Sequence, residues 1–493
     1  MAQPWSNALN IAMSAVQAAM TEYWDPRILQ ESQRLSDLVR IWNPKTKPWP
    51  AGNTKVHVRV QNQLLRATRA HGDLGVANAS ASALPQPQQT EAWTEWQIRQ
   101  EDLMSYLCPV RYRFKLNQLL GAKHIGPIAQ RLSKESIADV VERIEIALLT
   151  NQNGELAQVV HVSDEFKGYS DTHTNTSTHG RIWFNGSPAI FQPGDVLDLV
   201  SVEGSYFYGA PQTTAFSTHL KVTNVGYERG ASGVYGYIDY KPSEAGAAGT
   251  FHIDTVEGHP SSVYLLFAGE RGGSSAFYPG SSPAQPTSDC KNMYGLKDWF
   301  IEETGSPGTI YNKTRTSEPW TIPLVYKPST TRVVQLADID EVLTQVFQKR
   351  LADARLTEYV GLCGVRMAQK LTELTGTANR LIDGSQTKTR LFTNYGFNGS
   401  LIRHVGLDSA LAIYPVRGMP EDRIYVVQPG VLSLLQPGGV QWIPWHGDGG
   451  IWHAESDSSG QRTDVYRADR HVMVNSLIEL PRINAAILNI KPD

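Results

Sequence analysis

Hydrophobic residues in the first hundred positions change from a helical to an alternating period. Their spacing predicts amphipathic helices over residues 6–24 and 29–42, each followed by an Asp-Pro or Asn-Pro pair. From Thr54 apolar and polar residues alternate, which predicts a strand over residues 54–60, and a second strand is expected over residues 91–99. The residues between these strands are small and polar, and an isolated two-stranded hairpin is marginal in water. We therefore expect this hairpin to lie on another surface.

A further strand and a long helix are predicted in the next fifty residues. Residues 109–116 alternate between apolar and basic side chains, which predicts a strand. Residues 133–151 have the clearest helical pattern in the chain, with charged residues opposite the apolar stripe. The apolar stripe consists of Ile137, Val140, Val141, Ile144 and Leu148. We expect a scaffold helix with one buried face.

The segment 152–284 is rich in Gly, Ser, Thr and Tyr and has no helical period. Its short strands alternate with turn signals at the spacing typical of a compact β-barrel or sandwich. The predicted strands are residues 195–202, 219–227, 234–240 and 262–269. Residues 269–289 have the composition of a linker. We interpret the segment as an inserted all-β domain.

Helices and strands are mixed in the last third of the chain. Helices are predicted from Asp338, which is expected to cap the first of them with Glu341 three residues on, to a stop near Gly376. The remaining predictions are a strand followed by a short helix over residues 421–435 and strands over residues 471–480 and 485–490.

Composition places the chain among ordinary globular proteins. With 493 residues, 41% hydrophobic and 19% charged, it is long enough for two or more domains. A net charge of −3 gives no basic field for a protein whose whole surface binds DNA. Cys108, Cys290 and Cys363 form neither a CxxC pair nor a disulfide framework, which favours synthesis in a reducing compartment. Because we find no signal peptide and no run of about eighteen apolar residues, no membrane partner is expected.

Familiar catalytic signatures are absent from the sequence. It contains no GxxxxGK[ST], no strand-linked GxGxxG, no GxSxG and no HExxH. His173 and His179 lie in a Ser/Thr-rich stretch without a third spaced ligand, so incidental surface histidines are favoured over a metal site. We therefore expect no catalytic residue, no cofactor and no metal, and we do not expect an enzyme.

The stretch QWIPWHGDGGIWHAE, residues 441–455, is the best candidate for chemistry. Asp448 and Gly449 form a strong two-residue turn signal, which predicts a hairpin with Trp445 opposite Trp452. Such a pair contributes about 0.5–1 kcal/mol beyond burial and explains the aromatic density without catalysis.

The other face of this predicted hairpin carries His446, His453 and Glu455. Diagonal neighbours about 7 Å apart can share a metal ion. Pro444 indicates an exposed edge, where a dry catalytic pocket is hard to build. We favour a structural hairpin and keep a metal-dependent hydrolase with a β-rich carbohydrate-binding domain as the alternative.

Three arginines, Arg59, Arg66 and Arg69, lie in the first predicted hairpin and could contact phosphates. Aromatic residues are not interleaved with them as a stacking platform for nucleic acid requires. Charges on a hairpin edge are common, so a protein partner is favoured over DNA.

The chain resembles the major capsid proteins of tailed bacteriophages, which have the Hong Kong ninety-seven type fold. The resemblance lies in the order of these elements, in the stretch GTIYNKTRTSEPW at residues 308–320 and in the helix that opens at Asp338. The resemblance implies an α+β fold with an N-terminal arm, an extended β-hairpin loop, a spine helix in a peripheral domain, an axial domain and, here, an inserted all-β domain. The implied segments are a helical arm at 1–52, the extended loop at 53–99, the peripheral domain at 100–151 and 461–493, the β-barrel-like insertion at 152–284, a connector at 285–337 and the axial domain at 338–460.

The function that this resemblance implies is structural. Copies of the chain would assemble through hexamers and pentamers into the icosahedral shell of a virion, after synthesis in the host cytoplasm. The shell would enclose double-stranded DNA without sequence-specific binding, with portal, scaffolding and cement proteins as further partners. A cellular compartment shell of the same fold, with protein cargo, is an open alternative. Candidate contacts between subunits are Arg59, Arg66, Arg69, Trp93 and Trp96.

Overall fold

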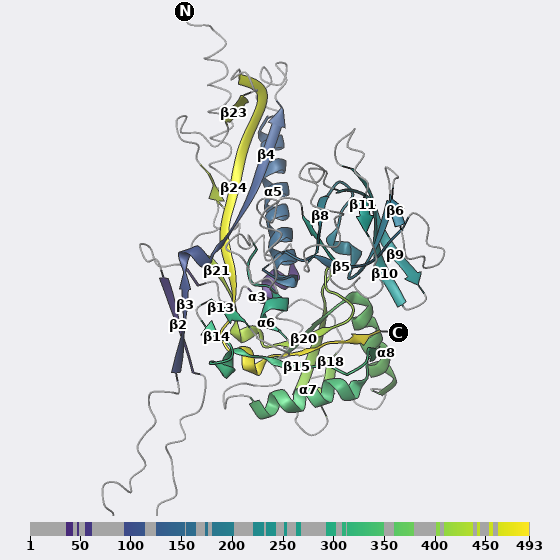
Figure 1. Cartoon of the computed structure of the whole chain (residues 1–493). Helices are drawn as coiled ribbons and strands as arrows, with labels where there is room; N and C mark the ends of the chain where they lie inside the picture. The colour runs from purple at the N-terminus through teal and green to yellow at the C-terminus, as the bar shows by residue number, and fades with distance from the viewer. Residues whose placement is uncertain are drawn as a thin grey trace, which may run out of the picture.

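The fold is taken from a computed structural model of the whole chain. Figure 1 shows an elongated sheet with one long helix beside it, a β-barrel, a second sheet with two helices, and a small hairpin at the side. The structure describes residues 36–42, 47–48, 55–61, 93–113, 125–152, 154–163, 173–175, 180–201, 220–230, 233–242, 251–253, 263–267, 292–301, 308–311, 313–349, 359–378, 401–404, 409–436, 441–443, 453–456 and 462–492.

The elongated sheet is built around two long strands, β4 (Met104–Arg113) and β24 (Arg462–Ile478), which are antiparallel neighbours. Alternation along β4 buries Cys108 and Val110 and exposes Leu107, Pro109 and Arg111. Four short strands complete the sheet: β1 (Lys47–Pro48), β21 (Leu432–Gln436), β22 (Gln441–Trp442) and β23 (His453–Ser456).

One face of this sheet is covered by α5 (Ile125–Leu149). All five residues of the predicted apolar stripe, from Ile137 to Leu148, are at most 4% exposed. The helix begins eight residues before the predicted start. The stripe therefore identified the buried face, whereas the start of the helix carried no capping signal in the sequence.

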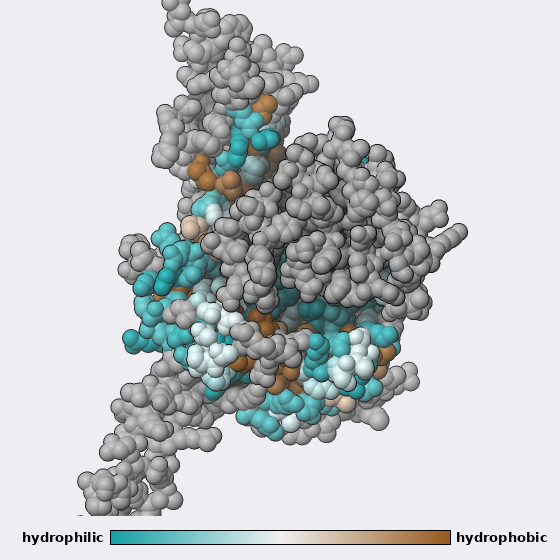
Figure 2. All heavy atoms as spheres, in the orientation of Figure 1, coloured by the Kyte–Doolittle hydropathy of each residue, from teal (hydrophilic) through white to brown (hydrophobic). Residues whose placement is uncertain are grey.

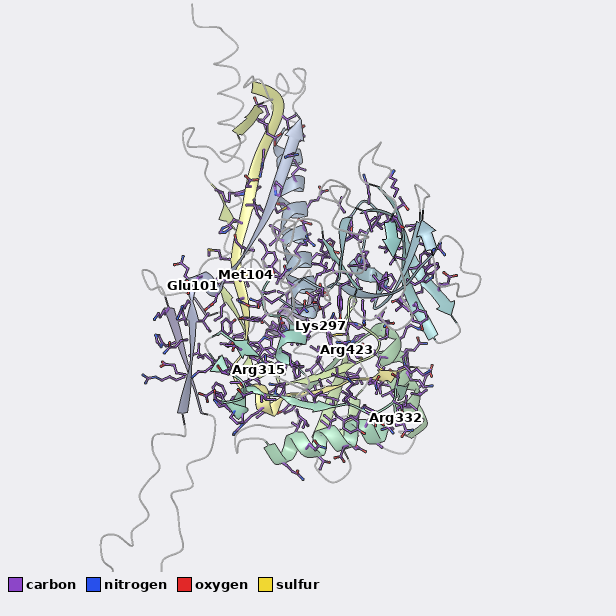
Figure 3. All side chains as sticks on the ribbon, in the orientation of Figure 1. Glu101, Met104, Lys297, Arg315, Arg332 and Arg423 are labelled. Carbon is purple, nitrogen blue, oxygen red and sulfur yellow. The ribbon has the colours of Figure 1, made fainter. Side chains whose placement is uncertain are left out.

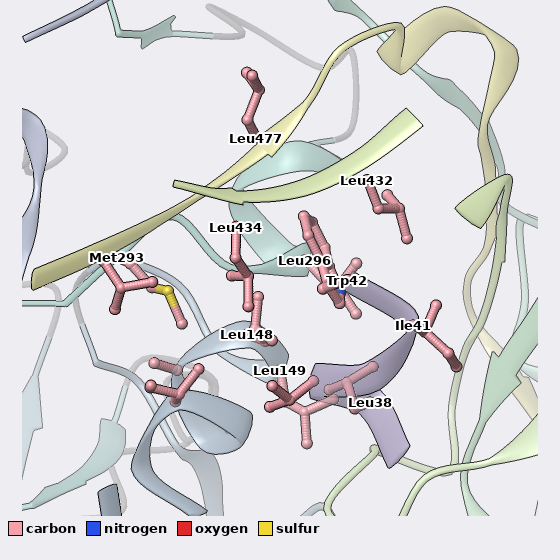
Figure 4. Close-up of a cluster of buried hydrophobic side chains, with 14 of the residues drawn as sticks. Leu38, Ile41, Trp42, Leu148, Leu149, Met293, Leu296, Leu432, Leu434 and Leu477 are labelled. Carbon is pink, nitrogen blue, oxygen red and sulfur yellow. The ribbon is translucent and has the colours of Figure 1, made fainter. Parts of the chain in front are cut away.

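A large hydrophobic core joins α5 to segments distant in sequence (Figure 4). The short helix α3 (Asp37–Trp42) begins where the Ser36 hydroxyl accepts a hydrogen bond from the Val39 amide at 3.2 Å, a typical N-terminal cap. It ends at Trp42, as predicted, and buries that indole completely. The first part of the predicted helix 29–42, and the predicted helix 6–24, lie outside the described residues. The short helix α6 (Leu296–Trp299) contributes Leu296 and Trp299 to the same hydrophobic core.

The β-rich segment contains a closed six-stranded barrel in which each strand is antiparallel to both neighbours. In barrel order the strands are β10 (Gly233–Pro242), β7 (Gly180–Asn185), β5 (Ala157–Ser163), β12 (Val263–Phe267), β8 (Val196–Ser201) and β9 (Leu220–Gly230). The four strands predicted from alternation are present, and β5 and β7 are additional. A separate pair is formed by β6 (His173–Asn175) and β11 (Phe251–Ile253).

The barrel interior is filled by a second hydrophobic core. The rings of Phe184 and Phe191 meet edge to face with centroids 5.1 Å apart. Gly236 leaves room for this packing, because a Cβ there would lie 2.6 Å from the Phe184 ring. The barrel is therefore a packed body, in which side chains fill the space between the strands.

The second large sheet mixes parallel and antiparallel pairs, and its central strands are buried on both faces. Its order is β15 (Leu324–Tyr326), β25 (Ala485–Ile487), β20 (Ile424–Val427), β17 (Val360–Cys363), β19 (Ser409–Pro415) and β18 (Leu401–His404). The helices α7 (Leu336–Lys349) and α8 (Val365–Ala378) share a core with one face, whereas Tyr425 and Val427 of the other face join the core around α5. Strands buried on both sides read as continuous apolar runs.

Two sequence predictions in this region are wrong in detail. The stretch from Asp338 to Gly376 is not helical throughout, because β17 lies between the two helices, and α8 continues through Gly376. Asp338 does not cap α7, which begins at Leu336. Its carboxylate accepts a hydrogen bond from the Gln335 amide at 3.1 Å and one from the Arg332 guanidinium.

The expected short helix within residues 421–435 is only a turn of 3₁₀ helix, after which the chain continues as β21. Among the described residues this turn is one of five, namely η3 (Gln100–Asp102), η5 (Pro188–Ile190), η7 (Pro319–Thr321), η9 (Pro429–Val431) and η10 (Pro481–Ile483). Remaining short strands are β13 (Thr309–Ile310), β14 (Lys313–Thr314), β16 (Arg332–Val333) and β26 (Ile490–Lys491).

Cys108 and Cys363 are both buried and free of disulfides, and Cys290 lies outside the described residues. Within the described part of the chain, no helix has the length and apolar character needed to span a membrane. On the face shown in Figure 2, hydrophilic and hydrophobic residues are intermixed over the lower part of the body.

Candidate assembly surface: the β2–β3 hairpin and its anchor

The predicted hairpin is formed by β2 (Lys55–Gln61) and β3 (Trp93–Arg99), which pair antiparallel with Val58 opposite Trp96. Both strands lie where the alternation predicts them. Among the described residues, neither pairs with a third strand, so each keeps an outer edge of unpaired backbone groups. Figure 1 shows the hairpin at one side of the body, away from the barrel.

The two faces of this hairpin differ in burial. Val58, Trp96 and Ile98 are at most 5% exposed, whereas Lys55 and Arg59 point to solvent. Period-two alternation explains the division, because successive side chains of a strand point to opposite faces. The hairpin is thus held to the body by one apolar face.

Trp96 is the anchor of that face. Its indole stands edge-on to Trp299, Trp320 and Tyr311, with centroid distances of 5.7, 4.8 and 6.2 Å. The indole N–H donates to the Glu479 carbonyl at 3.0 Å, so its polar atom is satisfied as well. Trp96 therefore fills an aromatic socket contributed by segments more than 200 residues away.

The outward face carries charge. Glu95 lies 3.1 Å from His57 and 3.6 Å from Arg59, and Arg99 lies 2.8 Å from Glu101. The Arg59 side chain is 81% exposed, and exposed pairs of this kind contribute little to stability. These groups are consequently available to a partner at little cost to the fold.

The predicted contact residues divide into three groups. Arg59 is exposed on the hairpin, as a contact residue must be. Trp96 is fully buried in the chain, so its indole faces the body and its contact with another copy stays a prediction. Arg66 and Arg69, and the side chain of Trp93, lie outside the described residues.

Next to the socket, at α6, lies a partly buried polar cluster that the sequence did not indicate, and Figure 3 labels Lys297, Arg315 and Arg423 of it. One Asp298 oxygen accepts hydrogen bonds from the Gln152 amide at 2.6 Å and the Gly295 amide at 2.9 Å. It thereby ties the start of the barrel segment to α6. Burial raises the pKa of Asp298 to about 7. The Lys297 ammonium donates to the Glu155 carbonyl at 3.3 Å, and burial lowers its pKa.

Two arginines complete this cluster. The Arg315 guanidinium donates to the carbonyls of Trp299 and Asp298 at the end of α6, and burial lowers its pKa to about 10. Arg423 forms two hydrogen bonds with Asp422, at 2.7 and 2.8 Å. Burial acts to raise the Asp422 pKa, but the charge and hydrogen bonds of Arg423 together with the charge of Lys297 outweigh it, so the pKa is lowered. The cluster is a structural junction of charges paired with backbone groups and with each other.

The stretch from Gln441 to Glu455 departs from its prediction at both ends. β22 and β23 each pair antiparallel with β24, along the edge that β4 leaves open. They follow one another in the same direction and are not partners in one hairpin. The hairpin predicted around Asp448-Gly449 therefore does not include residues 441–442 and 453–456, because both segments pair with the longer strand β24 and not with each other. Four predicted hairpin residues lie outside the described residues: Trp445, Asp448, Gly449 and Trp452.

The candidate metal ligands in this stretch have other surroundings. The Glu455 carboxylate lies 2.9 Å from the Arg111 guanidinium of β4, and His446 lies outside the described residues. Within the described ranges, no group of three His, Cys, Asp or Glu side chains is arranged to hold a metal ion. His173 lies in β6, and His179 is outside the described residues.

No protein-family model and no curated protein matches the chain. Among solved structures it is similar to the cyanophage A-1(L) capsid asymmetric unit, at 8% identity over 92% of this chain and 93% of that one, with a TM-score of 0.44. It is also similar to the satellite phage P4 procapsid with its size determination protein, at 9% identity over 100% and 98% of the two chains (TM-score 0.36). A third is the capsid of the native GTA particle, at 9% identity over 92% and 90% (TM-score 0.36).

Proposed function

We propose that this chain is the subunit of an icosahedral virion shell that encloses a phage genome. The observation that carries the proposal is the β2–β3 hairpin. It is fastened at its base by Trp96, presents a charged outer face, and has two strand edges that no described strand covers. A strand pair held out in this way is stabilised when it lies on another molecule.

The position of the hairpin favours closed rings. In Figure 1 it lies on the opposite side of the body from the barrel. When the hairpin of one copy contacts a different surface of the next copy, the contact is head-to-tail. Head-to-tail contacts close into rings when the rotation permits. Hexamers and pentamers are the rings from which an icosahedral shell is assembled.

The described elements support an assignment of the segments. Residues 1–52 serve as the arm and 53–99 as the extended loop. The peripheral domain combines 100–151 with 461–493, since α5 and β4 pack with β24. The axial domain is 338–460, and 285–337 connects it to the rest. The barrel strands, all within 157–267, support an inserted domain at 152–284.

Partners follow from this function. The chief partner is the chain itself, and portal, scaffolding and cement proteins are the further ones. Double-stranded DNA is enclosed without sequence-specific contacts, because the net charge of −3 provides no basic field. The subunit is made in the host cytoplasm and ends in the virion.

The function is structural and not enzymatic. The alternative, a hydrolase centred on His446, His453 and Glu455, is not favoured, because Glu455 pairs with Arg111 and no metal-binding group of His, Cys, Asp or Glu occurs among the described residues. A cellular compartment shell would share the subunit design and differ in its cargo.

Electron microscopy of the purified chain, alone and expressed with candidate scaffolding proteins, tests the proposal. We expect closed shells tens of nanometres wide, and nucleic acid rather than protein cargo in particles from infected cells. A chain that remains monomeric under every assembly condition would overturn it.

A variant with matched control sharpens this test. Lys55→Glu with Arg59→Glu reverses the charge of the exposed hairpin face and should reduce shell yield. Lys221→Glu with Lys241→Glu makes the same change in net charge on two exposed residues of the barrel, and should leave more shells than the hairpin variant.

A further inference from the structure

Asn185 is the last residue of β7, and the residue after it is Gly186. Alternation along the strand turns Phe184 into the barrel core and leaves Asn185 exposed. In the described part of the chain, the Asn185 carboxamide has no hydrogen-bonding partner. This side chain is therefore free to turn toward its own main chain.

The amide of Gly186 is unprotected as well. Gly186 adopts a φ of 146°, a conformation that suits glycine because it has no Cβ. No hydrogen bond joins its N–H group to another described residue, although backbone N–H groups in folded proteins are usually paired. The nitrogen that follows Asn185 is thus neither bonded nor shielded by a side chain of its own residue.

An exposed asparagine before such a glycine can react with its own main chain. The Gly186 nitrogen loses its proton to water and attacks Cγ of Asn185, while the bond from Cγ to Nδ2 breaks and ammonia leaves. The product is a succinimide ring that joins the two residues. Water then opens the ring at one of its two carbonyls, which gives either aspartate or isoaspartate. Water is the only co-reactant that these steps consume.

We propose that Asn185–Gly186 is a site of spontaneous deamidation, and that its isoaspartate form loosens the attachment of the barrel to the rest of the chain. In isoaspartate the main chain continues through the side-chain carboxyl group. The chain therefore gains a methylene group immediately before Gly186 and Ser187. This chemistry does not depend on the proposed shell function.

Ser187, which follows the reactive pair, helps to hold the barrel in place. It is only 3% exposed, and its hydroxyl donates to the Arg417 carbonyl of the turn after β19 at 3.2 Å. The same oxygen accepts from the Ala189 amide at 3.3 Å, which caps η5, and lies 3.2 Å from the Tyr227 hydroxyl. A longer main chain just before Ser187 would disturb all of these contacts together.

Another Asn-Gly pair, at residues 153–154, provides an internal control. The Gly154 amide donates to the Asn151 carbonyl at 2.9 Å. A bonded amide reacts only after the chain opens locally, so the hydrogen bond should slow ring closure there. Asn153 itself, and a third pair at residues 398–399, lie outside the described residues.

Peptide mapping by mass spectrometry tests the site in the native full chain, aged at mildly alkaline pH. Electron-transfer fragmentation identifies isoaspartate at each position. We expect Asn185 to deamidate at least about fivefold faster than Asn153, which is the protection that one backbone hydrogen bond provides. In urea the two rates should converge, because neither amide is then held. Reaction at Asn153 as fast as at Asn185 in the native chain would overturn the proposal.

Hydrogen exchange tests the effect on the barrel. Isoaspartate protein is separated from fresh protein by ion exchange, since it carries an added negative charge. We expect the Ala189 amide to exchange about fivefold faster in it, as the loss of one hydrogen bond predicts.

Two variants at the same position are the controls for this measurement. Asn185→Ser removes the carboxamide, and Asn185→Asp supplies the charge without the added methylene. Aged Asn185→Ser and fresh Asn185→Asp should both exchange at Ala189 as fresh wild type does. Unchanged exchange in wild type that carries isoaspartate, or equally fast exchange in fresh Asn185→Asp, would overturn the loosening by the longer main chain.

Discussion

The indole of Trp96 stands edge-on to the indole of Trp320, with ring centroids 4.8 Å apart and an interplanar angle of 71°. Edge-to-face pairs of this kind contribute about 0.5–1.5 kcal/mol beyond the burial of their area. Since Trp96 belongs to the hairpin and Trp320 to a 3₁₀ turn of the body, this contact determines where the hairpin begins to project.

Truncation of the anchor should loosen the hairpin. Trp96→Ala empties the aromatic socket and removes the hydrogen bond to the Glu479 carbonyl, so we expect a loss of about 3–5 kcal/mol in the free energy of unfolding by urea. Trypsin should also cleave faster after Arg59 and Arg99. Gln97→Ala, next in sequence and on the opposite face, is the control and should stay within about 0.5 kcal/mol of wild type. A Trp96→Ala loss below about 1 kcal/mol would show that the socket does not hold the hairpin.

Asp298 should make stability depend on pH. Burial raises its pKa in the folded chain from 3.8 to about 7, so the folded state favours the protonated carboxyl. Its contribution is fully present below about pH 4 and is lost as pH rises through about 7. Between pH 5 and 8, the wild-type free energy of unfolding should fall by roughly 2–3 kcal/mol relative to Asp298→Asn.

The Asn variant is informative because its side-chain oxygen can still accept from the Gln152 and Gly295 amides, while it has no proton to lose. Comparing wild type with the variant at each pH cancels the other titrating groups. Parallel stability curves for the two proteins would exclude Asp298 as the source of the pH dependence.

Gly295 should tolerate no side chain. An added Cβ would lie 2.0 Å from the Thr150 carbonyl oxygen and 2.6 Å from that of Ala147, and backbone atoms cannot rotate away. We expect Gly295→Ala to destabilise by at least about 1–3 kcal/mol, measured by thermal unfolding. Gly430→Ala is the matched control, because its nearest atom is 3.9 Å away. Equal melting temperatures for the two variants would contradict the close contact between α6 and the end of α5.

The two described cysteines should be unreactive in the folded chain. Burial raises the pKa of Cys108 to about 12 and raises that of Cys363 also, so neither forms the thiolate that attacks a disulfide reagent. In a Cys290→Ser background we expect no titratable thiol in native protein and two after denaturation. Rapid reaction of either thiol in native protein would show that the cores around β4 and β17 open readily.

Elements with a sustained period could be predicted from sequence. The stripe from Ile137 to Leu148 identified the buried face of α5, and alternation identified the strands of the hairpin and most of the barrel. β17 could not be found in this way. Its four residues, Val360–Cys363, stand between two amphipathic helices, and a short apolar run does not distinguish a buried strand from a turn of helix.

The candidate site was only half visible in the sequence. The strand over residues 91–99 could be predicted, but nothing local identified Trp299 and Trp320 as the surface that receives Trp96. The charged junction was hidden for the same reason, since Asp298 meets the Gln152 amide across 146 residues of sequence. Contacts of this range are decided by tertiary packing.

β24 is a single unbroken strand of 17 residues that runs the length of the elongated sheet, with β4 along one edge and β21, β22 and β23 in succession along the other. A pull along its axis would load these ladders in shear, so that many hydrogen bonds must yield together and cannot be peeled apart one by one. The ladders on its two edges thus make β24 resistant to a pull along its own axis.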